Sequence, residues 1–462
     1  MESAIFMKEF SFIPQTNTTG SPQWQGMLSV IRVLRDHGHQ AFLVGGGVRD
    51  LLLHKVPKDL DITTDATPDE IMALFEHSIP LGVSFGIVTV IVDSIPYEVA
   101  TFREEREYAD GRHPETVLYT KDPALDVIRR DFTINALLCD PLRGVIIDHT
   151  GGIDDLKKGI LRTVGDPMQR FSEDHLRMLR AIRFAARMNC TIHPETWDAI
   201  VHLAEKVSSV SRERIANELE KMLLHRSRER AFRMLAECGL LKTVLPEVDA
   251  MRGVTQPEKY HPEGDVFEHT MLMLTHIAVP TPELVWSVLL HDVAKPVTRT
   301  VKEDGIPHFY GHEAVGADMA EEILKRLHLP NAVIASVVPA VRNHMRFARV
   351  DEMKPAKWKR IIADPNFAVE LELHRIDCIS CHAFLNNYLL MLDRMREMEL
   401  EGREAALPPP LLNGKDLIGM GMKPGVAMGI LLREITDLQL NGQLNSREEA
   451  LAYAREKYIP AP

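Results

Sequence analysis

The spacing of apolar and polar residues changes character at about residue 150 of this chain. Residues 40–150 alternate short apolar runs with helical segments, whereas from residue 153 onward the apolar positions recur with helical spacing. Residues 25–37 predict a helix, and residues 1–24 show no regular pattern and predict a loose arm. The pattern therefore predicts an α+β head followed by a long helical region.

A glycine-rich turn is predicted near the start of the head. An apolar run at residues 41–44 is followed by three glycines, residues 45–47, and by a helix-forming segment at residues 48–54. Backbone N–H groups in such a turn, with the positive end of the helix dipole, bind phosphate groups. We therefore expect this strand, turn and helix to bind a triphosphate.

Two aspartates follow this turn closely. Asp59 and Asp61 lie in residues 58–63, which predict a second strand. Side chains two positions apart on a strand point to one face, so both carboxylates project together. Mg²⁺ prefers one or two carboxylates plus substrate phosphates. The combination predicts phosphoryl or nucleotidyl transfer by two metal ions about 3.5–4 Å apart.

Residues 86–102 predict a β-hairpin with its turn at Asp93 and Ser94. Glu98, on the second strand, is either a third metal carboxylate or a surface residue, and the sequence leaves both interpretations open. Residues 103–116 are dense in charged and turn-forming residues and predict a mobile loop.

The composition bears on nucleic-acid binding and on the cellular compartment. The formal net charge is −12, whereas a nucleic-acid binder is usually basic, yet residues 157–187 carry more basic than acidic side chains. The five cysteines are scattered, which fits a reducing compartment, and Cys378 and Cys381 lack the second pair of a zinc site. There is no apolar run of about 18 residues and no signal-peptide core, so we expect no membrane segment and a cytoplasmic location.

A helix capped by Ser172 and ending near Met188 is predicted to carry Asp174 and Arg177 on one face. Aspartate only accepts hydrogen bonds and arginine only donates them. Cytosine and adenine present an amino donor beside a ring-nitrogen acceptor, so this pair matches C or A and rejects U or G by about 10⁴-fold. The same spacing also suits a surface salt bridge. Arg180 continues the face and is a candidate for RNA phosphate.

Several segments, in order, resemble the motifs of class II tRNA nucleotidyltransferases, the CCA-adding enzymes of the polymerase-β-type superfamily. They are residues 45–61, 129–136, 148–156, 173–177 and 212–218, within a resemblance that covers about residues 40–240. The resemblance implies template-independent addition of CCA to the tRNA 3′ end from CTP and ATP, with Mg²⁺ held by catalytic Asp59 and Asp61.

The resemblance also implies nucleotide-binding roles for residues in three of these segments. They are Gly45, Gly46 and Arg49 for the triphosphate, Arg130, Asp131 and Asn135 for ribose and triphosphate, and Asp174, Arg177 and Arg180 for the base and its surroundings. An aspartate that accepts from a ribose hydroxyl would favour ribonucleotides.

Three alternatives share most of these features. A bacterial poly(A) polymerase has the same motifs, but residues 81–86 lack the basic pair that we associate with that branch. An enzyme that adds only A, with a separate C-adding partner, is barely distinguishable by sequence. An inactive RNA-binding module serving a phosphohydrolase is disfavoured, because Asp59 and Asp61 are intact.

A second chemistry is predicted in the C-terminal half. His269, His291 with Asp292, and Asp377 occur in the order found in HD phosphohydrolases, which this region resembles; His312 and His344 lie between them. Imidazole and carboxylate ligands suit Ni²⁺, Mn²⁺ or a similar transition metal. The resemblance implies a metal-dependent phosphohydrolase that acts on phosphomonoesters or 2′,3′-cyclic phosphates.

Residues 407–425 are rich in proline and glycine and predict a linker before a helix at residues 426–458. The expected fold is α+β, with a polymerase-β-type head that has a small mixed sheet, a helical neck and body, an all-α HD domain and a helical tail. The expected boundaries are residues 25–150, 151–250, 251–400 and 407–462. The oligomeric state stays open.

Overall fold

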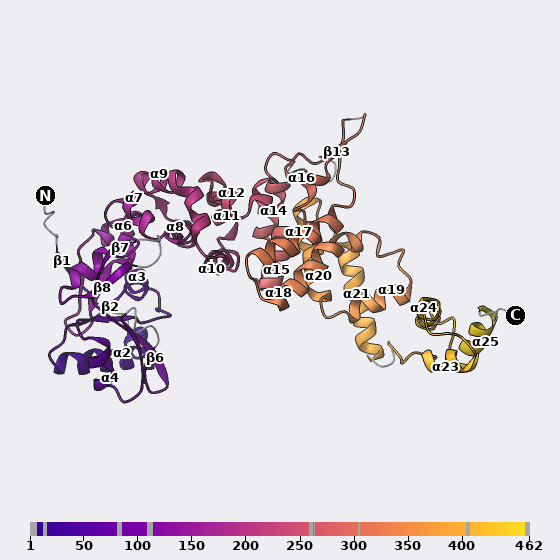
Figure 1. Cartoon of the computed structure of the whole chain (residues 1–462), viewed down its shortest axis with the longest axis horizontal. Coiled ribbons are helices and arrows are strands. Elements are labelled where there is room, and N and C mark those ends of the chain that lie inside the picture. The colour runs from indigo at the N-terminus through magenta and orange to yellow at the C-terminus, as the bar shows by residue number, and fades with distance from the viewer. Residues whose placement is uncertain are drawn as a thin grey trace. The chain divides into compact units, whose positions relative to one another are not determined.

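The computed structural model describes residues 7–12, 16–80, 86–108, 114–257, 262, 264–303, 305–402 and 407–457. The chain divides into two units, Met1–Pro246 and Glu247–Pro462, each with its own core (Figure 1). The first unit combines a sheet with helices and the second is almost entirely helical, which confirms the predicted α+β class. The finer four-part division stays a prediction.

The N-terminal unit is built on one mixed sheet of eight strands. Their order across the sheet is β1 (Lys8–Ser11), β10 (Val145–Asp148), β9 (Leu137–Asp140), β2 (Ala41–Val44), β3 (Ile62–Thr64), β6 (Ile95–Thr101), β5 (Ile87–Val92) and β4 (Ser78–Ile79). The β3–β6 pair is parallel, and the other pairs are antiparallel.

Helix α2 (Pro22–Asp36) covers one face of this sheet. Ser21 caps it, and proline at the first helical position suits its start. Its apolar side buries Trp24 and Ile31 in the same core as Ile62. The expected loose arm is therefore wrong for the described residues before Gln25, because β1 pairs with β10 and α2 begins at Pro22.

The predicted hairpin is confirmed as β5 and β6. The predicted mobile loop is partly wrong, since β7 (Arg103–Tyr108) and β8 (Pro114–Tyr119) pair as an antiparallel ribbon. The tip of that loop, residues 109–113, lies outside the described residues, as does most of the 81–86 segment that distinguished the poly(A) polymerase branch.

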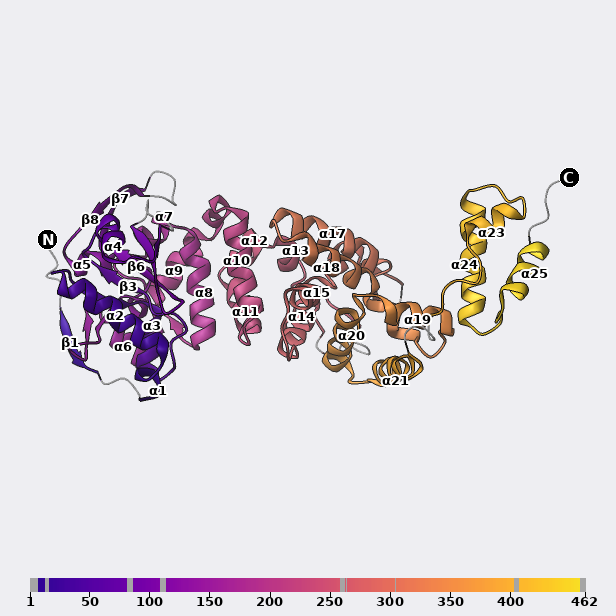
Figure 2. The same ribbon diagram turned by 90° about the horizontal axis from the view of Figure 1, so that it is seen from below.

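The helical part of this unit is arranged around α8 (Leu176–Met188). It packs against α10 (Arg212–Leu223) and α11 (Arg228–Glu237), and the three helices lie side by side in Figure 2. Leu179 and Ile182 of α8 are fully buried. The shorter helix α7 (Pro167–Glu173) packs beside α8 and also against α9 (Pro194–Leu203).

The link from the sheet into the helical part depends on Asp148, the last residue of β10. Its buried carboxylate accepts hydrogen bonds from four consecutive backbone N–H groups, those of residues 150–153, at 2.8–3.1 Å. These are the donors that open α6 (Gly152–Lys158), which otherwise lack partners at a helix start. One side chain therefore joins the strand end to the helix.

The C-terminal unit packs five main helices around one another. They are α14 (Val266–Thr275), α15 (Pro282–Leu290), α17 (His312–Arg326), α18 (Asn331–Asn343) and α20 (Phe367–Cys381). Beside them lie α19 (Pro355–Ala363) and α21 (Asn386–Glu401). These two helices share a core with the segment that follows α18. None of the described helices is long and apolar enough to cross a membrane.

The chain ends in three helices with a separate small core. They are α23 (Gly414–Gly419), α24 (Val426–Leu440) and α25 (Arg447–Lys457). The linker expected at residues 407–425 thus contains a capped helix, α23, whose Asn413 and Asp416 form a capping box. The expected single tail helix is two helices, because residues 441–446 form a turn.

Asp148→Ala should destabilise the N-terminal unit by about 3 kcal/mol, because it leaves several N–H groups without a hydrogen-bond acceptor at once. Asp122→Ala is the matched control: this exposed cap of α5 (Pro123–Ile128) accepts from a single N–H, so we expect a loss of about 1 kcal/mol. Urea unfolding followed by circular dichroism measures both. Equal losses for the two variants would contradict the role given to Asp148.

Candidate functional site

The glycine turn between β2 and α3 (Gly46–Leu52) lies directly against the first aspartate. Gly45 has a φ of 73°, a conformation that glycine adopts without strain. A Cβ at Gly47 would lie 2.9 Å from the backbone oxygen of Asp59, closer than real contacts allow. The missing side chain at Gly47 therefore lets the Asp59 segment pass against the helix.

Two guanidinium groups border the same turn. A Cβ at Gly45 would lie 3.5 Å from Nη1 of Arg130, and one at Gly46 would lie 3.4 Å from Nη2 of Arg49. These positive groups are the partners that a triphosphate at the turn would require. The four residues predicted to hold the triphosphate, two glycines and two arginines, are thus brought together.

The two aspartates precede β3 instead of lying within it, since the strand begins at Ile62. The carbonyl of Asp61 nonetheless accepts a hydrogen bond of 2.9 Å from the last residue of β2, so the pairing continues one residue further. The parallel register pairs Ile62 with Val99, which sets Asp61 beside Glu98. Because Ile62 and Val99 face the core, Asp61 and Glu98 face away from it.

These carboxylates influence one another. Burial of Asp61, together with the negative charges of Glu98 and Asp59, raises the pKa of Asp61 to about 6, while Arg130 acts in the opposite direction. Mutual repulsion of this kind is relieved when a divalent cation binds between the oxygens. The donor set of hard oxygens fits Mg²⁺, so the residues present suit the predicted metal.

A chain of hydrogen bonds connects the glycine turn with α8. Nη1 of Arg49 donates to Oδ1 of Asn135 at 2.6 Å, and Nδ2 of Asn135 donates to Oδ1 of Asp131 at 3.3 Å. Arg180 on α8 donates to Oδ2 of Asp131 at 3.0 and 2.8 Å. Arg49 and Arg180 both lie over the ring of Phe184.

The Asp131–Arg180 pair is charged. Burial alone would raise the pKa of Asp131, but the ion pair with Arg180 outweighs it and lowers the pKa below its ordinary value. The sequence assigned Asp131 to ribose and Arg180 to the surroundings of the base. The structure pairs them with each other, as part of this network.

The helix expected from Ser172 to Met188 is broken, and that prediction is wrong. Helix α7 ends at Glu173, Asp174 is extended with φ −149° and ψ 103°, and α8 begins at Leu176. Asp174 Oδ1 accepts from the backbone N–H of Leu176, the first residue of α8, at 3.1 Å. Asp174 and Arg177 therefore do not share a helix face.

Neighbouring elements orient both base-selection candidates. Oδ2 of Asp174 accepts from Nη2 of Arg214 on α10 at 2.8 Å. Nη1 of Arg177 donates to Oε2 of Glu173 at 2.6 Å, and its other terminal nitrogen donates to the carbonyl of Arg129 at 3.3 Å. The sequence contained Arg214 within a motif but offered no signal for its partner, which lies 40 residues earlier.

A second ion pair ties α8 to α10. Nε of Arg183 lies 2.6 Å from Oε2 of Glu218, and both side chains are at least nine-tenths buried. A basic pocket of about 360 Å³ opens beside this pair, lined among others by Lys58, Arg187 and Lys221. One of the residues that line this pocket, Lys58, directly precedes Asp59 in the sequence.

In the C-terminal unit the four predicted metal ligands come from three helices and meet in the core. Nε2 of His269 on α14 lies 3.1 Å from Oδ1 of Asp377 on α20. Nε2 of His291, which ends α15, lies 3.0 Å from Oδ2 of Asp292. Cys381 lies at the edge, with Sγ 3.8 Å from Nδ1 of His269, and both Cys378 and Cys381 lie on α20.

Two further histidines join this cluster. His312, which begins α17, and His344, which ends α18, place their Nε2 atoms 3.3 and 3.8 Å from Oδ1 of Asp292. The sequence showed them only as histidines between the expected ligands. Their separation along the chain hides the fact that both helices direct these side chains at one carboxylate.

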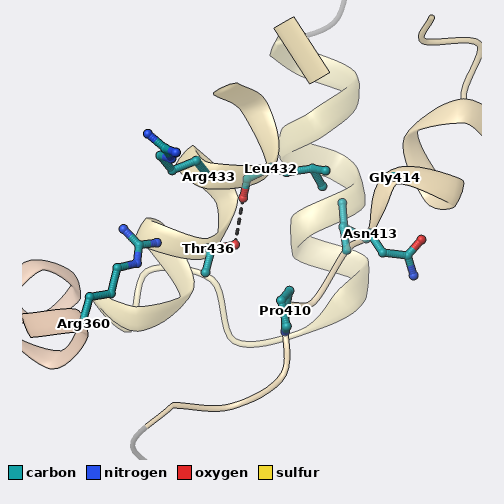
Figure 3. Close-up of a pocket in the computed structure, with 8 residues that line it drawn as sticks. Arg360, Pro410, Asn413, Gly414, Leu432, Arg433 and Thr436 are labelled. Atoms are coloured by element: carbon teal, nitrogen blue, oxygen red, sulfur yellow. Dashed lines mark hydrogen bonds between the residues drawn. The ribbon is translucent and has the colours of Figure 1, made fainter. Parts of the chain in front are cut away.

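The tail contains a larger pocket that lacks such chemistry. It has a volume of about 910 Å³ and is lined by Arg360, Arg433, Thr436 and Asn413, among others (Figure 3). Arg360 pairs with Asp437, and the hydroxyl of Thr436 donates to a carbonyl of its own helix. Neither carboxylate nor imidazole lines it, so its size does not make it the reaction site.

Three family models match the chain in order. They are the Poly A polymerase head domain at residues 41–162, the Probable RNA and SrmB-binding site of polymerase A at residues 189–252, and the HD domain at residues 266–366. The mixed sheet with its glycine turn and carboxylates lies within the first of these regions, so the chain combines a head of the Poly A polymerase class with an HD domain.

Individual relatives narrow the class. The CCA-adding enzyme of Lactobacillus johnsonii is 30% identical over 424 residues, which are 92% of this chain and 95% of that one. The crystal structure of the Bacillus stearothermophilus CCA-adding enzyme in complex with CTP is 27% identical, with a TM-score of 0.72, and covers 95% of this chain and 98% of that chain. This chain belongs to the CCA-adding enzyme family.

Another relative has a higher sequence identity over a shorter part of the chain. The CCA-adding enzyme of Anoxybacillus flavithermus is 44% identical over 226 residues, which are 49% of this chain and 56% of that enzyme. The chain thus matches about half the length of this relative.

Glu218→Ala should destabilise the N-terminal unit by about 3–5 kcal/mol, because it leaves Arg183 charged and buried without its partner. Replacing both residues, Arg183→Met with Glu218→Leu, should recover much of this loss. Glu229→Ala breaks a more exposed helical pair with Arg233 and should cost about 0.5 kcal/mol or less. Chemical unfolding measures all three; a double variant as unstable as Glu218→Ala would refute the ion-pair explanation.

Proposed function

We propose that this protein adds the 3′-terminal CCA to tRNA from CTP and ATP without a nucleic-acid template. The observation that carries the proposal is the cluster of Asp59, Asp61 and Glu98 beside a glycine turn bordered by Arg49 and Arg130. Carboxylates for a divalent metal and positive groups for a triphosphate adjoin one another, as nucleotidyl transfer requires. Family membership supports the same reaction.

Each part of the cluster has a distinct task. The glycine turn at Gly45 and Gly46, with Arg49 and Arg130, binds and orients the triphosphate. Asp59 and Asp61 would hold Mg²⁺, which when bound neutralises phosphate charge and favours the ionised 3′-hydroxyl. The terminal 3′-oxygen of the tRNA attacks the α-phosphorus, and the bond to pyrophosphate breaks.

Base choice rests on Asp174 and Arg177. Two carboxylate contacts of Asp174 are used internally, and a carboxylate has about four acceptor positions, so it retains capacity for a base amino group. Arg214 and Glu173 hold the two side chains in place, which limits the entropy lost on binding a base. The pair thus accepts from the amino group of C or A and donates to its ring nitrogen.

Two features support RNA binding and the cellular setting. The basic pocket of Lys58, Arg187 and Lys221 offers positive charge for backbone phosphates close to the carboxylates, despite the acidic overall composition. The five cysteines are all free, which suits the reducing cytoplasm.

The HD domain supports a second activity, a metal-dependent phosphohydrolase. Its histidines and aspartates converge, and all of them except the half-buried Asp377 are buried, which is costly for a purely structural core. Imidazole with carboxylate favours a transition metal such as Mn²⁺ or Ni²⁺ over Mg²⁺. Phosphate esters at RNA ends, including 2′,3′-cyclic phosphates, are the substrate class.

The deciding experiment uses three labelled tRNAs, one lacking CCA, one ending in C and one ending in C-C, with Mg²⁺, CTP and ATP. We expect all three to grow to CCA and stop, and Asp61→Asn to reduce the rate at least 10³-fold by removing a metal ligand. His382→Gln, an exposed change in the HD domain, should leave the rate unchanged.

The other outcomes identify the alternatives. Extension of only the C-C substrate by one A indicates an A-adding enzyme, and a long A ladder indicates a poly(A) polymerase. No addition at all, with intact phosphohydrolase activity, indicates an RNA-binding module that serves the HD domain.

Asp174→Ala should reduce discrimination against UTP and GTP by about 10²-fold or more, because the acceptor for the amino group is lost. Single-turnover incorporation of each of the four nucleotides measures the effect. Arg214→Ala should reduce discrimination less than Asp174→Ala, since it frees Asp174 without removing it. An Asp174→Ala variant that still excludes UTP and GTP would overturn the assignment.

A further inference from the structure

A short β-ribbon precedes α17 in the C-terminal unit. β13 (Thr300–Val301) pairs antiparallel with β14 (Pro307–His308), and Figure 1 shows β13 in an extension that stands away from the helices. Both residues of β13 are exposed, so the ribbon contributes little to the helical core. Its outward side chains are therefore open to a ligand.

Two aromatic rings and a cation lie together on this ribbon. The rings of His308 and Tyr310 stack, with their centroids 5.3 Å apart and their planes 6° from parallel. Tyr310 is 66% exposed, so most of its surface faces solvent. The amine of Lys302 lies 5.3 Å from the centroid of the Tyr310 ring and donates to its hydroxyl at 2.9 Å. An exposed aromatic ring beside a cation is the arrangement that binds an unpaired nucleobase and its backbone.

The residue between these two rings contacts the cluster of histidines and aspartates described above, here called the HD cluster. The ring of Phe309 lies 5.5 Å from the amine of Lys295, which is 2.6 Å from a carboxylate oxygen of Asp292. The carbonyl oxygen of Phe309 accepts from Nδ1 of His312 at 2.7 Å. The exposed rings and the contacts with the HD cluster therefore alternate along one short segment.

This alternation limits the distance between the exposed ring and the HD cluster. Tyr310 precedes His312 by two residues, so their Cα atoms are at most about 7 Å apart. Successive phosphates of a nucleic-acid strand advance by about 3.4 Å along the helix axis. A strand with a phosphate at the HD cluster would thus have an adjoining base within reach of the Tyr310 ring. A small phosphate ester without a base would gain nothing from that ring.

We propose that Tyr310, supported by His308 and Lys302, binds the terminal base of an RNA strand whose end phosphate lies at the HD cluster. The proposal rests on the phosphohydrolase function proposed above and names unpaired RNA ends as its substrate class. Stacking tolerates any base, because every base has a π-face. Tyr310 thus selects single-stranded RNA ends over small phosphate esters, with little preference among the four bases.

Binding is tested by titrating the full chain into a short unstructured RNA that has 2-aminopurine as its last base and a 3′-phosphate. The fluorescence of 2-aminopurine falls when the base stacks, so the signal reports the contact itself. We expect quenching by the unchanged protein and a Kd at least about 10-fold higher for Tyr310→Ala, which removes the stacking surface. Tyr310→Phe keeps the ring and should retain the quenching.

Hydrolysis in the presence of Mn²⁺ tests the selection of substrate. RNA ending in a 3′-phosphate or a 2′,3′-cyclic phosphate is compared with glycerol 2-phosphate and glycerol 1,2-cyclic phosphate, which have the same two kinds of ester without a base. The RNA preference is kcat/KM for the RNA divided by kcat/KM for the matching glycerol ester. Tyr310→Ala should reduce this preference at least about 10-fold, through KM and not through kcat.

Phe384→Ala is the matched control. Phe384 is 70% exposed and stacks on a histidine, His382, in the same unit, but it follows α20 and lies outside the ribbon. The substitution removes an exposed stacked ring, as Tyr310→Ala does, and should leave both the Kd and the RNA preference unchanged. Because Tyr310 is exposed, Tyr310→Ala should fold, which circular dichroism checks.

The contrary results are distinct. A Kd and an RNA preference that Tyr310→Ala leaves unchanged overturn the proposal, and so does an equal loss with Phe384→Ala. A loss of quenching with Tyr310→Phe overturns stacking as the contact. If the unchanged protein hydrolyses none of these substrates, the phosphohydrolase function fails, and the fluorescence titration alone decides whether Tyr310 binds the base.

Discussion

The partly buried ion pair between Asp131 and Arg180 is the interaction on which the candidate nucleotide site depends. Asp131 lies between strands β8 and β9 of the head and Arg180 lies on α8, so this contact joins the part that we propose to hold the triphosphate to the part that we propose to select the base. Removing one partner would leave the other charged group without its ionic partner in a partly buried position, at a cost of about 1–3 kcal/mol. The cost of that separation keeps the two parts of the N-terminal unit in one arrangement.

The surrounding contacts extend this constraint in both directions. Asn135 connects Asp131 by hydrogen bonds to Arg49 at the glycine turn, and the Arg183–Glu218 ion pair connects α8 to α10. Arg214, on α10, then orients Asp174. Side-chain contacts, and not one continuous helix, therefore link Asp174, which we propose to read the base, to Arg49, which we propose to bind phosphate.

Both halves of the chain bring together groups that repel one another. In the head three carboxylates lie close together where β3 begins beside β6, and in the HD domain imidazole lone pairs and carboxylates meet in the core. Each arrangement costs stability without a cation and gains it when one binds. A fold that holds such groups in place before binding is the common physical basis proposed for both activities.

The sequence alone indicated the residues that we propose to carry this chemistry. The glycine triplet, the paired aspartates and the ordered histidines are local patterns, and local spacing is visible in a sequence. It also indicated an α+β head and a helical remainder, because apolar periodicity is set residue by residue. Only the tertiary structure decided how these residues meet. The parallel register of β3 and β6 sets Asp61 beside Glu98, and separate helices direct His312 and His344 at Asp292. The same holds for the contact of Asp174 with Arg214 at the break in the helix, because pairings between residues far apart in the chain depend on packing and not on spacing.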